Sequence, residues 1–123
     1  MALLRFLARS LFATTFLTGG YSAFTQPGGR ATAVSRALPL PQPELMVRIN
    51  GATMMLGGAA LALGIKPRLA ALGLAASLVP TTYVGHQFWA QTEAGTRRTH
   101  TIHFTKNASL VGGLLAYALT GDR

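Results

Sequence analysis

The side chains best suited to proton or metal chemistry in this sequence are its three histidines, His86, His100 and His103. Imidazole titrates near neutral pH and is a common metal ligand in proteins. His100 and His103 are one helical turn apart, but no metal-ligand spacing links all three residues. Hydrogen bonding at a membrane interface is the simpler role. We therefore predict no metal site, and the sequence identifies no catalytic residue.

Other reactive combinations of residues are scarce in the chain. It has no cysteine and three acidic residues, which excludes thiolate chemistry and disfavours paired carboxylates. Gly57-Gly58 and Gly112-Gly113 lie inside apolar runs and do not form a phosphate-binding loop. The sequence predicts a protein that is not an enzyme on its own. It is compatible with a role as one subunit of an oxidoreductase.

The composition indicates that lipid surrounds most of the chain. Of 123 residues, 50% are hydrophobic and 11% are charged, whereas soluble domains carry roughly 25% charged residues. The net charge of +8 comes from basic residues beside the apolar runs, such as Lys66 and Arg68. Such residues anchor helices at lipid headgroups. No basic and aromatic platform accompanies them, so we predict a lipid bilayer as partner and no nucleic acid.

Four apolar segments predict four membrane-spanning helices in a single domain over residues 1–123. They cover about 3–24, 45–65, 68–89 and 102–120, and about 20 helical residues cross a hydrocarbon core of about 30 Å. The three residues Lys66-Pro67-Arg68 leave room only for a tight turn, which makes the flanking helices antiparallel. The predicted fold class is an all-α, antiparallel four-helix transmembrane bundle. A cleaved signal ending near residues 21–23 is the alternative for the first segment, and it leaves three spans.

Residues 25–44 are predicted to form a linker. Glycines at its start and alternating prolines near its end break regular structure. Residues 31–38 can form a short helix on the lipid headgroups, with Arg30 and Arg36 facing phosphate.

Antiparallel connectivity would gather polar side chains at one end of the bundle. The candidate site residues there are Arg48, Asn50, His86, Trp89, His103, Lys106 and Asn107. Polar groups at this depth are costly, so they face the interior or extend to the interface. One interpretation is a pocket open to water, a quinone headgroup or a protein partner. The other is a set of interfacial anchors and interhelical hydrogen bonds.

Several segments resemble the DoxX family of small bacterial membrane proteins. They are residues 47–52, 61–64, 67–71, 78–82 with 85–89, and 104–107 with 110–115. The resemblance implies four transmembrane helices, a bacterial inner membrane and redox partners. The family takes its name from a subunit of a thiosulfate:quinone oxidoreductase, and some relatives are linked to oxidative-stress complexes with a superoxide dismutase and a sulfurtransferase. Many members carry a glutamate early in the second helix, and the apolar stretch after Asn50 has no acid here.

Together these features predict an accessory subunit of a membrane-associated redox complex, linked to quinone or oxidative stress. No cofactor is firmly implied, and a quinone is a ligand that the polar face could hold. A non-catalytic scaffold or assembly protein is the alternative. A small transporter is a third, although no intramembrane acid marks an ion path. Basic residues such as Arg5, Arg9 and Lys66 favour a multi-pass protein of the cell membrane with both termini in the cytoplasm.

Overall fold

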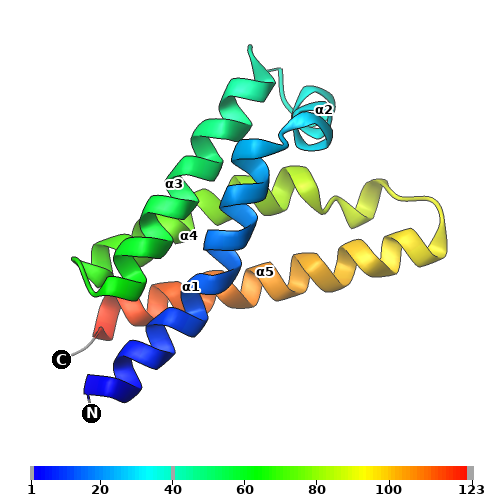
Figure 1. The fold of residues 1–123 in the computed structure, drawn as a ribbon. Coiled ribbons are helices and arrows are strands. Elements are labelled where there is room, and N and C mark those ends of the chain that lie inside the picture. The colour runs from blue at the N-terminus through cyan, green and yellow to red at the C-terminus, as the bar shows by residue number, and fades with distance from the viewer. Residues whose placement is uncertain (1, 40, 122–123) are drawn as a thin grey trace.

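The computed structural model describes residues 2–39 and 41–121, and it contains helices and no strand in these ranges. The elements, in chain order, are α1 (Ala2–Thr25), α2 (Gly28–Ala37), α3 (Pro43–Leu63), α4 (Pro67–Gly85), the 3₁₀ turn η1 (Phe88–Ala90) and α5 (Ala94–Thr120) (Figure 1). The predicted all-α class is confirmed. Residues 1, 40, 122 and 123 of the predicted domain lie outside the described residues.

Three predicted boundaries differ from those of the structure. The predicted linker over 25–44 contains the ten-residue helix α2. The helix predicted over 68–89 ends at Gly85, and η1 follows it. The helix predicted over 102–120 begins at Ala94, because the carboxylate of Glu93 accepts hydrogen bonds from the backbone N–H groups of Gly95 and Thr96. Such a cap satisfies amides that a helix start leaves unpaired, even where the sequence is polar.

Helices α1 and α3 form an antiparallel pair that packs backbone against backbone. A Cβ atom built on Gly51 would lie 2.7 Å from the carbonyl oxygen of Gly20, and one built on Gly20 would lie 2.6 Å from the carbonyl oxygen of Gly51. Further along the pair, Gly58 faces the side chains of Phe16 and Leu17. Close approach through small residues is the usual way for helices to associate in lipid.

Helices α4 and α5 form a second antiparallel pair. At one end, the Arg68 guanidinium donates hydrogen bonds to the backbone oxygens of Ala118 and Leu119, both at 2.7 Å. These carbonyls lie in the last turn of α5, where a helix has no partner of its own for them, so Arg68 caps α5 from the start of α4. At the other end of the pair, His86 after α4 contacts His100 on α5.

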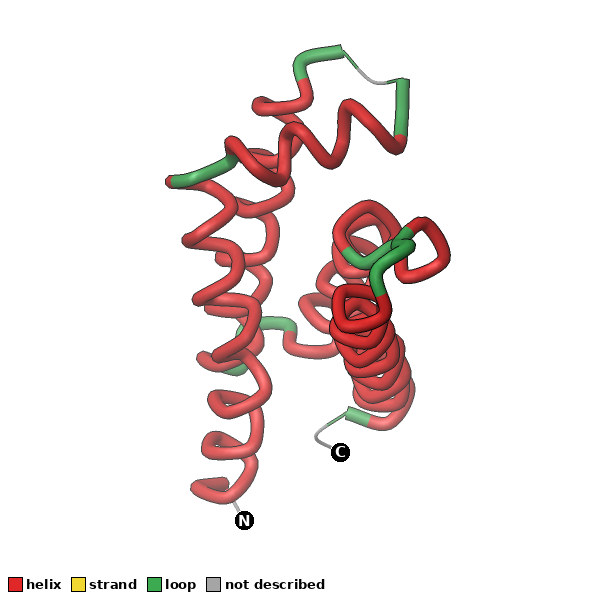
Figure 2. The backbone as a smooth tube through the Cα atoms, turned by 90° about the vertical axis from the view of Figure 1, so that its right-hand side faces the viewer, coloured by secondary structure: helices red, strands yellow, loops and turns green. Residues whose placement is uncertain are grey.

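The two pairs cross steeply instead of lying parallel to one another. Figure 2 shows α1 and α3 upright while α4 and α5 are seen nearly end-on. The hydrophobic core lies at the crossing, where Phe16, Leu61, Leu74 and Leu114 from the four long helices are fully buried. Helix α2 lies across the end of the first pair (Figure 2). The part of the α4/α5 pair beyond the crossing extends away from α1 and α3 (Figure 1).

The outer surface of the helices is rich in exposed apolar side chains. Leu11 is 72% exposed, Leu56 is 74% exposed and Leu119 is 71% exposed. Two stretches, Pro43–Leu63 and Pro67–Ala90, are long and apolar enough to cross a membrane, with mean hydropathies of 1.3 and 1.2. These two are among the four predicted spans.

Candidate functional site

A cavity of about 600 Å³ lies where α1, α2, α3 and α4 meet. Most of its lining is apolar, and the polar lining residues are Arg30, Asn50, Thr53, Thr81 and His86. Helix α2 contributes the side that carries Arg30, Ala33 and Val34. Cavities that bind small molecules commonly have this size, an apolar wall and a few placed polar groups.

Asn50 is the centre of a polar network on one wall of this cavity. Its amide nitrogen donates to the Thr81 hydroxyl at 2.6 Å, and its amide oxygen accepts from the Ser77 hydroxyl at 2.5 Å. The same nitrogen lies 3.7 Å from the Met54 sulfur. Sulfur is a weak acceptor, so one N–H of the amide is held loosely and is available to a stronger acceptor. The Asn50 network also joins α3 to α4.

The three histidines come together beside the cavity. The Nδ1 atoms of His86 and His100 are 3.2 Å apart. The ring of His103 stacks on His86 with centroids 5.0 Å apart, and the Lys106 Nζ lies 3.4 Å from Nδ1 of His103. His86 is the member that also lines the cavity. The cluster of His86, His100, His103 and Lys106, called the histidine cluster below, therefore borders the cavity through one residue.

Four aromatic rings pack next to the histidine cluster. Phe104 meets Phe88 and Trp89 edge to face, with centroids 5.3 and 5.9 Å apart, and Tyr83 lies 5.8 Å from Trp89. Edge-to-face geometry is a favoured arrangement for such rings. These contacts hold the η1 turn against α5.

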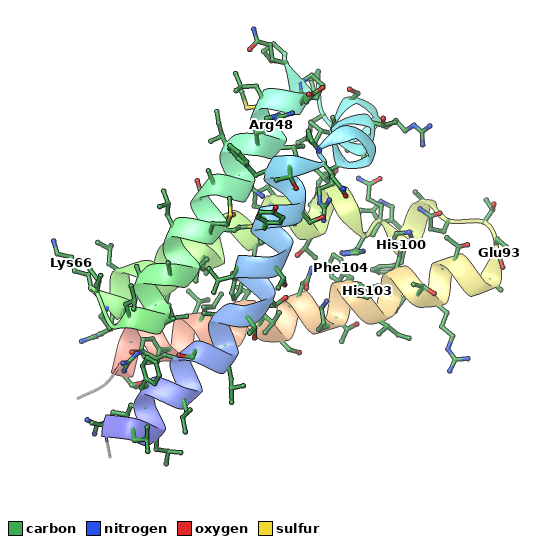
Figure 3. All side chains as sticks on the ribbon, in the orientation of Figure 1. Arg48, Lys66, Glu93, His100, His103 and Phe104 are labelled. Carbon is green, nitrogen blue, oxygen red and sulfur yellow. The ribbon has the colours of Figure 1, made fainter. Side chains whose placement is uncertain are left out.

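Two of the predicted site residues lie apart from this cavity. Arg48 is partly exposed and pairs with Glu44 at 3.3 Å, and Figure 3 shows it near the start of α3, away from His100 and His103. Asn107 is buried in α5, with 6% of its surface exposed. Neither is among the residues that line the cavity. Asn50 and His86 line it, while Trp89, His103 and Lys106 lie in the adjoining ring and histidine clusters.

The sequence-based prediction omitted His100, Ser77, Thr81 and Arg30 from the site. His100 was missed because hydropathy alone placed the beginning of the fourth helix at residue 102, which left His100 in the preceding loop. Arg30 was missed because α2 was treated as part of a linker. The Glu93 cap, an acid two residues before a glycine and three before a threonine, was the signal that would have extended the helix.

The chemistry that this arrangement allows is hydrogen bonding and proton movement. Among residues 2–39 and 41–121, no group of three or more histidines and acids is arranged to hold a metal ion. The glutamates of this part of the chain are engaged elsewhere: Glu44 with Arg48, and Glu93 with the start of α5. The hydrogen bonds to Glu93, first from the Thr96 hydroxyl and then from backbone N–H groups, lower the pKa of its carboxyl.

Comparison with known proteins identifies the family. No curated protein and no solved structure matches the chain. The family model named DoxX matches residues 4–87, which run from α1 through the cavity-lining parts of α2, α3 and α4 to the residue after His86. The resemblance noted in residues 104–107 and 110–115 lies outside the matched range. Because the match covers more than half of the sequence, the chain belongs to the DoxX family.

Proposed function

We propose that this protein is an accessory membrane subunit of a redox complex and that its cavity holds the ring of a quinone. The observation that carries the proposal is the 600 Å³ cavity, which is apolar apart from a few hydrogen-bonding groups. A quinone ring is flat and apolar and carries two carbonyl acceptors. The cavity offers it apolar walls and the donors of Asn50 and His86.

Asn50 fits the role of a carbonyl donor. Of the two N–H bonds on its amide, one is committed to Thr81 and the other is directed at the Met54 sulfur, 3.7 Å from the nitrogen. A quinone carbonyl is a better acceptor than a thioether. The amide is also fixed by Ser77 through its oxygen, so binding requires little reordering of the side chain.

We also propose a membrane topology for the protein. Helices α1, α3, α4 and α5 each cross the membrane of the bacterial cell, and both termini face the cytoplasm. In favour of this are the exposed apolar side chains on all four helices and the basic turn at Lys66 and Arg68 between α3 and α4. The histidine cluster then faces the outside of the cytoplasmic membrane, where an exported partner can reach it.

The direct test is purification from native membranes in a mild detergent, followed by extraction and mass measurement of bound lipids. We expect quinone to accompany the wild-type protein together with an oxidoreductase. Val84 lines the cavity and Val79 is exposed on the same helix. V84W should lose most of the quinone because indole occupies the cavity, and V79W should retain it. Absence of quinone from the wild type, or equal quinone in both variants, would contradict the proposal.

The scaffold alternative is favoured by the exposed rings of Tyr83 and Trp89, which offer a docking surface without any need for a ligand. Crosslinking in cells separates the two functions. A stable partner that keeps its full turnover when His86 and His103 are replaced by alanine would support the scaffold.

A further inference from the structure

The contact between His86 and His100 constrains the protons of both rings. Two Nδ1 atoms at 3.2 Å can share a hydrogen bond only if one carries a proton and the other presents a lone pair. If His100 is the donor, neutral His86 has its Nδ1 lone pair occupied and its proton on Nε2. His86 lines the cavity, and His100 is half-buried on α5. The pair therefore joins the cavity to the outer part of the α4/α5 pair.

The side chains around the pair are mostly basic. Lys106 and His103 lie beside it on α5, and Arg30 on α2 lines the same cavity. In the described residues, the carboxylates of Glu44 and Glu93 are bonded to Arg48 and to the start of α5. No carboxylate of the described residues is therefore bonded to the pair to compensate an added positive charge.

We propose that His100 and His86 form a proton relay from water to the ring bound in the cavity. This inference rests on the proposed function, because it needs a quinone as the acceptor. It adds to that function a route for protons and a role for His100. The relay also gives a role to the contact between His86, which lines the cavity, and His100, which does not.

Conversion of a quinone to its quinol takes up two electrons and two protons. The electrons come from a partner subunit that carries a flavin or an iron–sulfur centre. The bond between Nε2 of His86 and its hydrogen breaks, and a bond from that hydrogen to the reduced quinone oxygen forms. The Nδ1 proton of His100 moves to Nδ1 of His86, and a water molecule, which leaves as hydroxide, protonates His100 on Nε2. The pair delivers one of the two protons in each reduction, and the other comes from water directly. After the quinol leaves, water that enters the cavity protonates Nε2 of His86 and both hops run in reverse, which restores the starting tautomers.

The test follows protonation of a short-tailed ubiquinone bound to the full chain in detergent. Binding is measured first, through quenching of Trp89, which is the one tryptophan of the chain. Pulse radiolysis then adds an electron to the bound quinone, and protonation of the semiquinone anion is followed by absorbance. We expect H100A and H100Q to slow protonation by about a hundredfold, the usual size of a lost proton-transfer group, with an unchanged dissociation constant. Free imidazole should restore the rate of H100A.

Thr99 supplies the matched control. It neighbours His100 on α5, and its hydroxyl bonds to the backbone oxygen of Gly95 in its own helix, so T99A should protonate quinone at the wild-type rate. If the wild type does not bind quinone, the proposed function and the relay both fail. If quinone binds and H100Q matches the wild type, the relay alone fails. A slow H100A that imidazole does not rescue would assign His100 a structural role and overturn the relay.

Discussion

The α1/α3 pair and the outer part of the α4/α5 pair are built in opposite ways. In the first, Gly20 and Gly51 bring two backbones into contact. In the second, histidine and aromatic side chains from η1 and α5 fill the space between the helices. Backbone contact leaves little freedom, whereas a layer of rings can be rearranged by a ligand or a proton. The molecule therefore combines a rigid pair with a pair whose outer end is packed through rings and carries the three histidines.

The largest effect is expected where the backbones touch. In G51L the new Cβ would lie 2.7 Å from the Gly20 oxygen and 2.9 Å from the Phe24 nitrogen, and both are backbone atoms that cannot move aside. The variant should lose at least about 3 kcal/mol in its free energy of unfolding, measured by SDS titration in mixed micelles. Gly73 has nothing within 4 Å of its would-be Cβ, so G73L should change stability by less than about 0.5 kcal/mol. Equal losses of stability in G51L and G73L would contradict the difference in packing between the α1/α3 and α4/α5 pairs.

An intermediate effect is expected at the network that joins the pairs. N50L removes the hydrogen bonds to Ser77 and Thr81 and leaves the buried Ser77 hydroxyl without that acceptor. We expect a loss of about 2 kcal/mol, because single interhelical bonds in lipid contribute about 0.6 to 1.7 kcal/mol. A double-mutant cycle with S77A checks this. If the loss of stability in the double variant equals the sum of the losses in N50L and S77A, the two side chains do not interact.

A smaller effect is expected in the ring layer. F104A removes the edge contacts to Phe88 and Trp89, and such ring pairs contribute about 0.5 to 1.5 kcal/mol each. We expect about 1 kcal/mol of destabilisation and a shift in the Trp89 emission as the indole becomes more exposed. Ile102 is 58% exposed on the same helix, so I102A should leave the emission unchanged. An unaltered spectrum in F104A would mean that the rings do not hold η1.

The smallest effect is expected at the start of α5. Hydrogen bonds lower the folded-state pKa of Glu93, so its stabilising effect is present above the unfolded pKa and is lost as pH falls through the folded pKa. Acidification should therefore lower the protection factors for amide exchange at Gly95 and Thr96 only. E93Q should remove this pH dependence. An acid-induced loss of protection that spreads to α1 and α3 would show that the α5 start is coupled to the rigid pair.

The sequence predicts the apolar helices well because a long apolar run of about 20 residues indicates a helix directly. It does not predict which glycines matter. Gly73 and Gly112 face open space, whereas Gly20 and Gly51 form the backbone contact, although all four lie in or beside apolar runs. The face that a glycine presents depends on how the helices cross. That crossing is set by tertiary packing.

The residues of the candidate site were also predicted only in part from the sequence. Asn50 and His86 could be predicted because a polar residue in an apolar run is unusual in any sequence. Arg48 was predicted on the same grounds but lies outside, beside Glu44. His100 could not be placed, because its helix begins with polar residues for which hydropathy carries no helical signal, and because its partner His86 follows a helix end that no hydropathy window locates.

The length of α5 has a consequence for the proposed membrane topology. Helix α5 has 27 residues, which is about 40 Å at 1.5 Å per residue, and a typical hydrocarbon core is about 30 Å thick. Its first eight residues, 94–101, are mostly polar and include Arg97 and Arg98. In the proposed topology these residues extend beyond the hydrocarbon core, and the apolar part of the helix crosses it. His100 and His103 would then stand at the depth of the lipid headgroups, at the border between water and the interior of the protein.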